Sequence, residues 1–501
     1  MEQLQKRLDL VKETLRKAEV YRHAAKVIGY DRETICPPKA LEEEGKLTAF
    51  LGSEAFKLTK TEEFISAAEY LYEHREGLGE LDRVMAEHLH RVYEKVKNIT
   101  PEMNYSDSLI RSKAYENWLN AKRQADFSLF ARSLEEVSEM LVRNVRLRDS
   151  HSDDPYDDLL GDHETGVTCT DVDEWFGRFR DRILPLLRKI TESSKKIRTD
   201  FLSRPVTDEQ QRKMARYILE VMKYDFDRGA FTTTEHPFTS DLGRDDIRIT
   251  TNYKPCQFTA NIYTVAHEGG HALFEQLVPA EYHDHFVTDC RTSGMHESVS
   301  RFYENVIGRS PEFIRLIYPK AREIFADQLY DVSEREFYEG VNTVTPSLVR
   351  TEADEFTYSL HIIIRFEIEK DMANGRVRIE DLPRIWREKY REYLGIEPQN
   401  DREGILQDVH WTFSLGYFPT YALGNMYNAM YYTKMKEAFD VGDAVLAGDF
   451  GKINGWMAEN VFRRADLVPP KQWIREICGR EFTPDAYIEY LENKYGALYG
   501  V

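Results

Sequence analysis

The chain has 501 residues, of which 42% are hydrophobic and 31% are charged. This balance is typical of a globular protein that buries a large core. The formal net charge is −19, which argues against nucleic acid and anionic membranes as partners. Only 27 glycines and 18 prolines are present, and so few turn-forming residues favour long helices over many short strands.

The sequence has no apolar segment behind its first basic residues and no run of ~18 apolar residues, the length that a membrane-spanning helix needs. We therefore expect a cytoplasmic protein without a membrane partner. The five cysteines are widely spaced and form no CxxC pair. This pattern supports neither a disulfide framework nor a thiolate zinc site.

Helical periodicity begins near the N-terminus, where apolar residues recur at intervals of three and four: Leu4, Leu8, Val11, Leu15 and Ala18. Similar patterns continue through residues 45–150. Thr100-Pro101 and Thr483-Pro484 each predict a helix start, with the threonine as cap and the proline in the first turn. Asp153-Asp154-Pro155 and residues 161–170 predict a loop between helices.

Residues 225–260 break the helical pattern, because Thr, Phe, Ile and Tyr alternate there with polar residues. This alternation predicts two or three short strands, with a turn at Asp241-Leu242-Gly243. The sequence contains neither an internal repeat nor a linker rich in Pro, Gly or Ser. We therefore expect a mainly α-helical protein with one small β-sheet. Residues 1–501 would form a single catalytic unit, either undivided or folded as two lobes around a cleft.

The clearest functional motif is His267-Glu268-Gly269-Gly270-His271, in a segment that reads as a helix ending at Pro279. Two histidines at i and i+4 lie on one helix face, so their imidazoles can bind one metal ion. Glu268 lies about 100° around the helix and could reach a water on that ion. The alternative is a polar helix face that carries two unrelated histidines.

The two glycines inside this helix are unfavourable by ~1 kcal/mol each relative to alanine. They would also permit close approach of another segment, such as a substrate or a helix that carries a ligand. The motif His296-Glu297-Ser298 begins 25 positions after His271 and opens a second helical run. A catalytic zinc with two histidine ligands needs a third protein ligand, and we predict that Glu297 supplies it. The alternative is a carboxylate that merely favours the first turn of its helix.

A zinc site of this kind suits hydrolysis of an amide, with Glu268 as the general base. The oxyanion also needs a hydrogen-bond donor beside the metal. Residues 404–424 contain His410, Trp411, Tyr417 and Tyr421 close together. We predict an oxyanion or substrate role for His410 and one of the two tyrosines, and core packing for Trp411.

Three further residues are candidates for substrate binding. His236 and Arg248 fall in the β segment, where a strand edge could pair with an extended peptide. Arg248 could instead form an ion pair with Asp246. Arg350 is predicted on a helix with acidic neighbours, where it would form an ion pair or bind a substrate carboxylate in bidentate fashion.

At this point six ordered motifs match a known family. The chain resembles the thermostable carboxypeptidases, zinc peptidases of the carboxypeptidase Taq type. The motifs are HPF at 236–238, DxRxT at 246–250, HExxH at 267–271, HES at 296–298, RxxAD at 350–354 and GxxQDxHW at 404–411. Two further stretches, YDRETICPP at 30–38 and PYDDLLGDHETG at 155–166, are also similar.

The resemblance implies an all-α fold with a deep groove and a small sheet at its floor. It also implies metal-dependent removal of C-terminal amino acids from peptides that have a free C-terminal carboxylate, with broad side-chain tolerance. One zinc ion per chain, with cobalt as an alternative, and a homodimer are further implications. The implied roles are those of metal ligand for His267, His271 and Glu297, base for Glu268, and substrate-facing residue for His236, Arg248, Arg350 and His410. Two positions depart from the family pattern, Val299 after HES and Val349 before Arg350.

Two alternatives to a carboxypeptidase are an oligoendopeptidase and a scaffold protein without activity. A related helical zinc oligoendopeptidase would share HExxH and a distant glutamate. A helical scaffold with a relic site would bind no metal and hydrolyse no peptide. A carboxypeptidase should lose most of its activity on a C-terminally amidated peptide, whereas an endopeptidase should not.

Overall fold

The computed structural model describes residues 2–288 and 291–501, and most of them lie in α-helices. One three-stranded sheet accompanies the helices in this part of the chain. The predicted fold class, mainly α with a small sheet, is therefore confirmed. Cys36, Cys169, Cys256 and Cys478 are free thiols, and Cys290 lies outside the described residues. None of the described helices combines the length and apolar composition that a membrane crossing requires.

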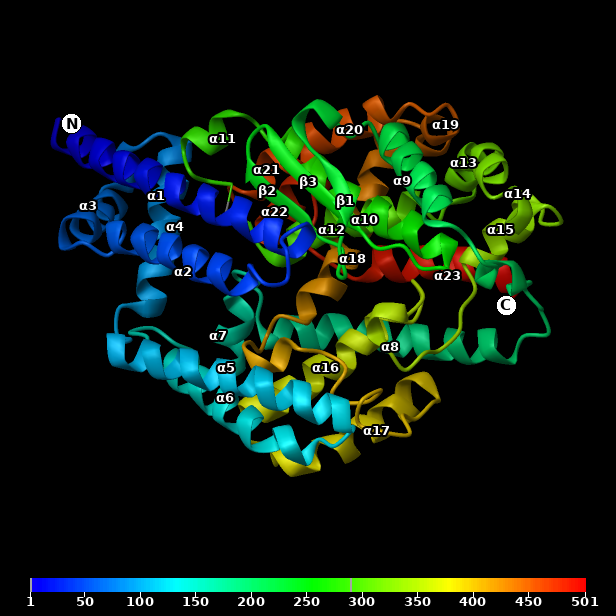
Figure 1. The fold of residues 1–501 in the computed structure, drawn as a ribbon, viewed down its shortest axis with the longest axis horizontal. Coiled ribbons are helices and arrows are strands. Elements are labelled where there is room, and N and C mark those ends of the chain that lie inside the picture. Colours follow the sequence, from blue (N-terminus) through cyan, green and yellow to red (C-terminus); the bar gives the residue numbers. More distant parts are fainter. Residues whose placement is uncertain (1, 289–290) are drawn as a thin grey trace.

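The N-terminal helices form a separate group beside the sheet (Figure 1, blue). The predicted stripe on the first helix is largely confirmed, because Leu8, Val11, Leu15 and Ala18 are buried there. Leu8, Val11 and Leu15 join apolar side chains of the third and fourth helices in a hydrophobic cluster distinct from the main core. The group comprises α1 (Glu2–Thr34), α2 (Leu41–Leu58), α3 (Glu62–Glu73) and α4 (Glu80–Val96).

A second group of helices lies along the lower side of the molecule in Figure 1. The predicted helix start at Thr100 is confirmed, because its side chain accepts a hydrogen bond from the Met103 N–H. The predicted loop at Asp153–Pro155 is shorter than expected: Asp154 caps a helix that starts at Pro155. The group comprises α5 (Pro101–Gln124), α6 (Ser128–Arg146), α7 (Pro155–Gly161), α8 (Cys169–Glu192), α16 (Tyr358–Ala373) and α17 (Leu382–Leu394).

The sheet has the strand order β1-β3-β2, so β3 is its central strand. The strands are β1 (Phe231–Thr233), β2 (Thr239–Gly243) and β3 (Asp246–Thr251), with β1 parallel and β2 antiparallel to β3. The turn predicted at Asp241–Gly243 was wrong, because these residues continue β2 and Leu242 is buried. The chain turns at the next two residues, Arg244 and Asp245.

The remaining helices follow α8 in the chain, and most of them contribute side chains to the main core. The helix predicted to end at Pro279 is confirmed as α10 (Phe258–Leu277). Thr483 and Pro484 precede the last helix, although the cap position is Pro484 rather than Thr483. The other helices are α9 (Asp208–Met222), α11 (Glu281–Asp284), α12 (Ser293–Arg301), α13 (Pro311–Ile324), α14 (Ala326–Leu329), α15 (Glu334–Val341), α18 (Pro419–Ala438), α19 (Val441–Leu446), α20 (Phe450–Met457), α21 (Arg463–Ala465), α22 (Pro470–Cys478) and α23 (Asp485–Tyr499).

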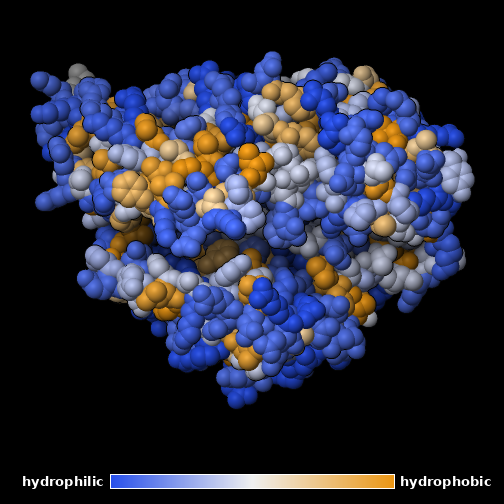
Figure 2. Space-filling model, viewed as in Figure 1, coloured by the Kyte–Doolittle hydropathy of each residue, from blue (hydrophilic) through white to orange (hydrophobic). Residues whose placement is uncertain are grey.

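The main hydrophobic core joins side chains from α5 to α23. The helices α10, α12 and α18 lie inside it, and this is why nearly every side chain of α10 from Phe258 to Gln276 is buried or half-buried. Figure 2 shows apolar side chains on the surface of the N-terminal helices and a hollow in the face below them. The exposed apolar residues of α2 include Leu47, Phe50 and Phe56.

Candidate metal centre

The HExxH motif lies in the middle of α10 and places both histidines on one face. The imidazole centroids of His267 and His271 are 4.9 Å apart, as expected for residues one helical turn apart. The helix continues through Gly269 and Gly270 without a break. Tertiary packing on both sides of α10 therefore outweighs the poor helix propensity of the two glycines.

Gly270 allows a second helix to approach the motif. A Cβ atom at this position would lie 2.7 Å from the Ser300 Cα atom of α12, closer than real contacts allow. Without that atom, α12 packs directly on α10 and brings Glu297 to the histidines. The Glu297 Oε2 atom lies 3.7 Å from His267 Nε2 and 3.5 Å from His271 Nε2.

A second layer of polar side chains orients these three groups. The His267 Nδ1 atom lies 2.9 Å from Glu304 Oε2, in a π-helical segment, Phe302–Ile307, that continues α12. The Arg301 guanidinium donates to Glu297 Oε1 at 3.0 Å and to Glu304 Oε2 at 3.2 Å. Such partners fix the tautomer and ring orientation of a metal-binding histidine.

The electrostatics of this group follow from its burial and its charges. Burial opposes the charged form of His267, but the nearby Glu297 and Glu304 carboxylates outweigh it and raise its pKa to about 9. Burial also opposes ionisation of Glu304, yet Arg301 and His267 lower the pKa of this carboxyl to about 2. The pKa of Glu297 is held well below its usual range, against its burial, by His267, His271 and Arg301.

Two imidazole nitrogens and one carboxylate oxygen thus converge on one point. This donor set is that of a catalytic zinc site with three protein ligands. The hydrogen bond at His267 Nδ1 leaves Nε2 as the atom that faces the other donors. The residues therefore fit a divalent cation, and the structure brings together all three ligands that the sequence predicted.

Glu268 is 7% exposed and is held by a strand of the sheet. The Thr239 hydroxyl of β2 donates to Glu268 Oε2 at 2.7 Å and lies 2.9 Å from the Glu268 carbonyl oxygen. The negative charge of Glu268 also contributes to the raised pKa of His267. This carboxylate therefore lies beside the three converging donors without being one of them.

The aromatic segment at residues 410–421 lies close to the same group. The His410 Nε2 atom is 3.3 Å from the Tyr421 hydroxyl, and the Tyr417 and Tyr421 rings are 5.3 Å apart. Burial lowers the pKa of His410 to about 4. Burial and the charge of Glu297 both raise the pKa of Tyr417. Trp411 is 3% exposed and donates to Glu369 at 2.7 Å, which agrees with its predicted core role.

Arg350 does not lie on the helix that the sequence predicted. It starts a single 3₁₀ turn, Arg350–Glu352, because the Asp354 carboxylate accepts from the Thr345 and Thr357 N–H groups and holds a loop there. Its ion-pair partner is Asp408, to which Nε and an Nη atom donate at 3.0 and 2.9 Å. Arg350 also donates to the Tyr358 hydroxyl at 3.1 Å and is 7% exposed.

The two candidates from the β segment have different surroundings. Arg248 forms a bidentate ion pair with Asp246 at 2.8 and 2.7 Å, and its guanidinium lies 4.9 Å from the centre of the Tyr30 ring. His236 is exposed in the connection between β1 and β2. Arg248 lies on β3, the central strand, so only β1 or β2 offers a free edge to an extended peptide.

Three residues that hold the site together were not predicted from the sequence: Glu304, Asp408 and Thr239. Glu304 had a signal, since it follows Glu297 by seven residues and therefore shares its helix face. Asp408 was inside the GxxQDxHW motif, but nothing in its spacing connected it to Arg350. The contact of Thr239 with Glu268 depends on how the sheet packs against α10, which no local pattern specifies.

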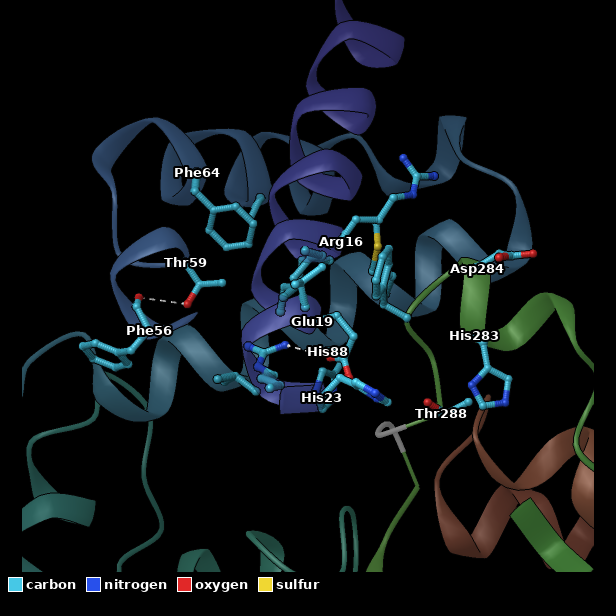
Figure 3. A pocket seen from close by; sticks show the side chains of 18 of the residues that line it. Arg16, Glu19, His23, Phe56, Thr59, Phe64, His88, His283, Asp284 and Thr288 are labelled. Atoms are coloured by element: carbon cyan, nitrogen blue, oxygen red, sulfur yellow. Dashed lines mark hydrogen bonds and ion pairs between the residues drawn. The ribbon is translucent and has the colours of Figure 1, made fainter. Parts of the chain in front are cut away.

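One cavity lies away from these residues. It measures about 860 Å³ and lies between α1, the α2–α4 helices, β2 and α11. Figure 3 shows His23 and Glu19 of α1 on one side and His283 and Thr288 on the other. A second group of possible metal ligands, Glu69, His90 and Glu94, lies on α3 and α4. His90 already pairs with Glu69 at 3.0 Å and Glu94 with Lys97 at 2.7 Å, so ion pairs account for this group.

Comparison with known proteins extends the sequence resemblance to nearly the whole chain. The model of the carboxypeptidase Taq (M32) metallopeptidase family matches residues 10–495. Carboxypeptidase 1 of Bacillus subtilis is 38% identical over 488 residues, which cover 97% of each chain. Thermostable carboxypeptidase 1 of Thermus thermophilus is 36% identical over 420 residues, 82% of each chain.

The fold agrees with the same relationship. The crystal structure of the M32 carboxypeptidase from Deinococcus radiodurans superimposes with a TM-score of 0.95 at 31% identity, covering 99% of this chain and 100% of that one. Fold and sequence together show that the chain belongs to the carboxypeptidase Taq (M32) family of metallopeptidases, metal-dependent carboxypeptidases that hydrolyse peptide bonds.

Proposed function

We propose that this metallocarboxypeptidase holds one zinc ion per chain with His267, His271 and Glu297, and removes C-terminal amino acids with broad side-chain tolerance. The observation that carries the proposal is the convergence of two Nε2 atoms and Glu297 Oε2 within 3.5–3.7 Å, beside the Glu268 carboxylate. Cobalt prefers the same nitrogen and oxygen donors and could replace zinc.

Glu268 acts as the general base in this proposal. Zinc, when bound, would polarise the scissile carbonyl and lower the pKa of a water molecule. Glu268 accepts the proton of the attacking water on its carboxylate and later delivers it to the leaving amine. The hydrogen bond from Thr239 to Oε2 fixes the plane of that carboxylate, which favours transfer through the other oxygen.

The aromatic segment supplies donors for the oxyanion. Since the pKa of His410 is lowered to about 4, its imidazole is neutral near pH 7 and can donate one N–H. Tyr417 and Tyr421 keep their hydroxyl protons because burial raises the pKa of each. Both tyrosines remain candidates for the donor that stabilises the oxyanion.

Arg350, Arg248 and His236 are the proposed substrate-binding residues. Three of the five N–H groups of Arg350 have partners among the described residues, so two are left for a substrate carboxylate. The substrates are peptides with a free C-terminal carboxylate, and nucleic acid is no partner. We further propose a cytoplasmic homodimer in which residues 1–501 form one catalytic unit.

The Glu268→Gln variant tests the central role. Its ligands are untouched, so it should bind zinc like the wild type while kcat falls by a factor of about 10³ or more. The measurements are metal content after dialysis and hydrolysis of a short peptide. Glu63→Gln, an exposed glutamate on α3, is the control and should retain full activity. Full activity in Glu268→Gln would contradict the proposal.

The same peptide with a C-terminal amide distinguishes a carboxypeptidase from an endopeptidase. A carboxypeptidase should lose most of its activity on the amide, because the carboxylate-binding groups are left without a partner. An enzyme that cleaves both peptides at similar rates, at internal bonds, would instead act as an endopeptidase.

A further inference from the structure

The loop between α7 and α8 contains a glutamate that is completely buried at the start of α12. Glu164 has no exposed surface, although it lies more than a hundred residues before that helix in the sequence. The Thr292 hydroxyl donates to Glu164 Oε1 at 2.8 Å, and the Gly294 backbone N–H also bonds to this carboxyl group. The Ser293 N–H donates to the neighbouring His163 carbonyl at 3.3 Å.

These contacts replace the cap that α12 lacks. The first N–H groups of a helix have no partner inside the helix, and a side chain at the cap position usually accepts from one of them. Thr292 occupies that position in α12 but accepts no such bond. The loop at 163–164 accepts instead, from Ser293 and Gly294, so the helix is capped by a different part of the chain.

Small residues leave room for this arrangement. A Cβ atom on Gly294 would overlap the Glu164 carboxyl group. The helix α18 also approaches α12 closely, because a Cβ atom on Gly424 would lie 3.1 Å from the Ser298 nitrogen and 3.2 Å from Glu297 Cγ. Gly270 on α10 and Gly424 on α18 thus let two helices pack closely on α12, while Glu164 bonds to its start.

The same loop also contacts the aromatic segment of the site. The His163 Nε2 atom lies 3.0 Å from the Ser414 hydroxyl, and the edge of its ring packs against Tyr417 with centroids 5.1 Å apart. Two consecutive residues therefore contact the helix of Glu297 on one side and the segment of His410 and Tyr417 on the other.

We propose that Glu164 is a positioning residue that caps α12 from outside and so fixes the metal ligand Glu297. Glu297 follows Gly294 by three residues, and one helical turn transmits any displacement of the capped end to its carboxylate. The proposal rests on the proposed role of Glu297 as a ligand. Outer-shell partners of metal ligands typically affect metal affinity by 10- to 100-fold, and Glu164 should do so through backbone groups.

The test compares zinc affinities, measured by competition with a chromophoric chelator well below the melting temperature of each variant. Glu164→Ala leaves the Thr292 and Gly294 donors without a partner, and its affinity should fall at least fivefold. Glu164→Gln keeps an acceptor oxygen of the same reach and should restore affinity to within twofold of the wild type. A fall of less than fivefold in Glu164→Ala would overturn the proposal.

Two further variants separate positioning from general stability. Glu355→Ala removes another buried glutamate, which binds Tyr490, Lys494 and Tyr495. This variant should lower the melting temperature and leave zinc affinity unchanged. Equal losses of affinity in Glu355→Ala and Glu164→Ala would overturn the proposal. If Glu164→Ala does not fold, Thr292→Val replaces it as the test. This variant removes the hydroxyl donor to Glu164 at nearly constant side-chain shape and should weaken zinc affinity. An unchanged zinc affinity in Thr292→Val would overturn the positioning role of Glu164.

The variant Glu297→Gln tests the proposed metal site separately. It should lose most zinc affinity whether or not Glu164 positions α12. Loss of zinc in Glu297→Gln together with full affinity in Glu164→Ala would leave the metal site in place and overturn only the positioning role. Full affinity in Glu297→Gln would overturn both.

Discussion

Two buried arginines share one aspartate near the site, and they differ in how far solvent can reach them. Arg350 is 7% exposed, whereas Arg365 is completely buried, and both donate to Asp408. A substrate carboxylate could reach only Arg350. This difference provides an internal control for its proposed role.

Replacing each arginine by lysine should therefore have different kinetic effects. Lysine keeps the charge but loses the planar pair of donors that binds a carboxylate. We expect Arg350→Lys to raise KM for a free-carboxylate peptide about tenfold and to change KM for its amide little. Arg365→Lys should affect both peptides equally. Equal effects of Arg350→Lys on the two peptides would restrict Arg350 to its ion pair with Asp408.

The buried carboxyl group of Glu369 makes the stability of the fold depend on pH. Burial raises its pKa to about 7, against hydrogen bonds from Tyr156, Gly416 and Trp411. The folded protein thus keeps a proton that the unfolded chain has released, and stability falls as pH rises from about 4.5 to 7. At ~1.4 kcal/mol per pKa unit this loss amounts to roughly 3–4 kcal/mol.

Glu369→Gln should remove that dependence. Melting temperatures of the variant should decline less steeply than those of the wild type between about pH 4.5 and 7. The slope is compared rather than the absolute value, because the amide also changes the hydrogen bonds. Glu392→Gln, an exposed glutamate on α17, is the control and should give a curve parallel to the wild type. A parallel curve for Glu369→Gln would refute the assignment.

At the scale of helices, the site depends on how closely α10 and α12 cross. Gly270→Ala would place a Cβ atom 2.7 Å from the Ser300 Cα atom, so the helices must separate. We expect a stability loss of about 1–3 kcal/mol and a clear loss of metal affinity, measured by thermal melting and zinc competition. Gly52 on α2 is the control, because a Cβ atom there would meet no other atom within 4 Å. Gly52→Ala should therefore raise the free energy of unfolding by about 0.5–1 kcal/mol. A similar gain in Gly270→Ala would refute the crossing argument.

The elements that the sequence predicted well are those whose signal is local. The stripe on α1, the threonine cap at residue 100 and the HExxH helix each depend on neighbours three or four residues away. Glu297 could also be predicted, because a zinc site needs a third ligand and its spacing allowed a second helix. The family motifs made the activity predictable as well.

The residues that the sequence could not predict depend on long-range packing. Arg350 was predicted on a helix with acidic neighbours as its ion-pair partners, but its actual partner, Asp408, lies 58 positions away. The turn expected at Gly243 was displaced because Leu242 is buried against the core and the strand continues past it. Local propensity gives way in both cases to contacts that form only in the complete fold.

At the scale of the whole molecule, the described residues bury two separate hydrophobic clusters. One joins α1, α3 and α4 to Tyr282 and Val287, and the other contains α10, α12 and α18. All three proposed metal ligands belong to elements of the second cluster. Metal binding should therefore stabilise that cluster directly and reach the N-terminal helices only through contacts such as that between His23 of α1 and the Leu242 carbonyl, 2.5 Å apart.

Removal of the metal by a chelator should reveal this division. A ligand present at 100 times its Kd stabilises the folded state by about 2.7 kcal/mol, so the melting temperature of the wild type should fall on chelation. His271→Gln lacks a ligand and should show no such fall. Hydrogen exchange should speed up in Phe258–Leu277 and Ser293–Arg301 but stay unchanged in Glu62–Glu73 and Glu80–Val96, because opening is local to the unit that loses the contact. Equal acceleration in all four helices would mean that both clusters unfold as one cooperative unit.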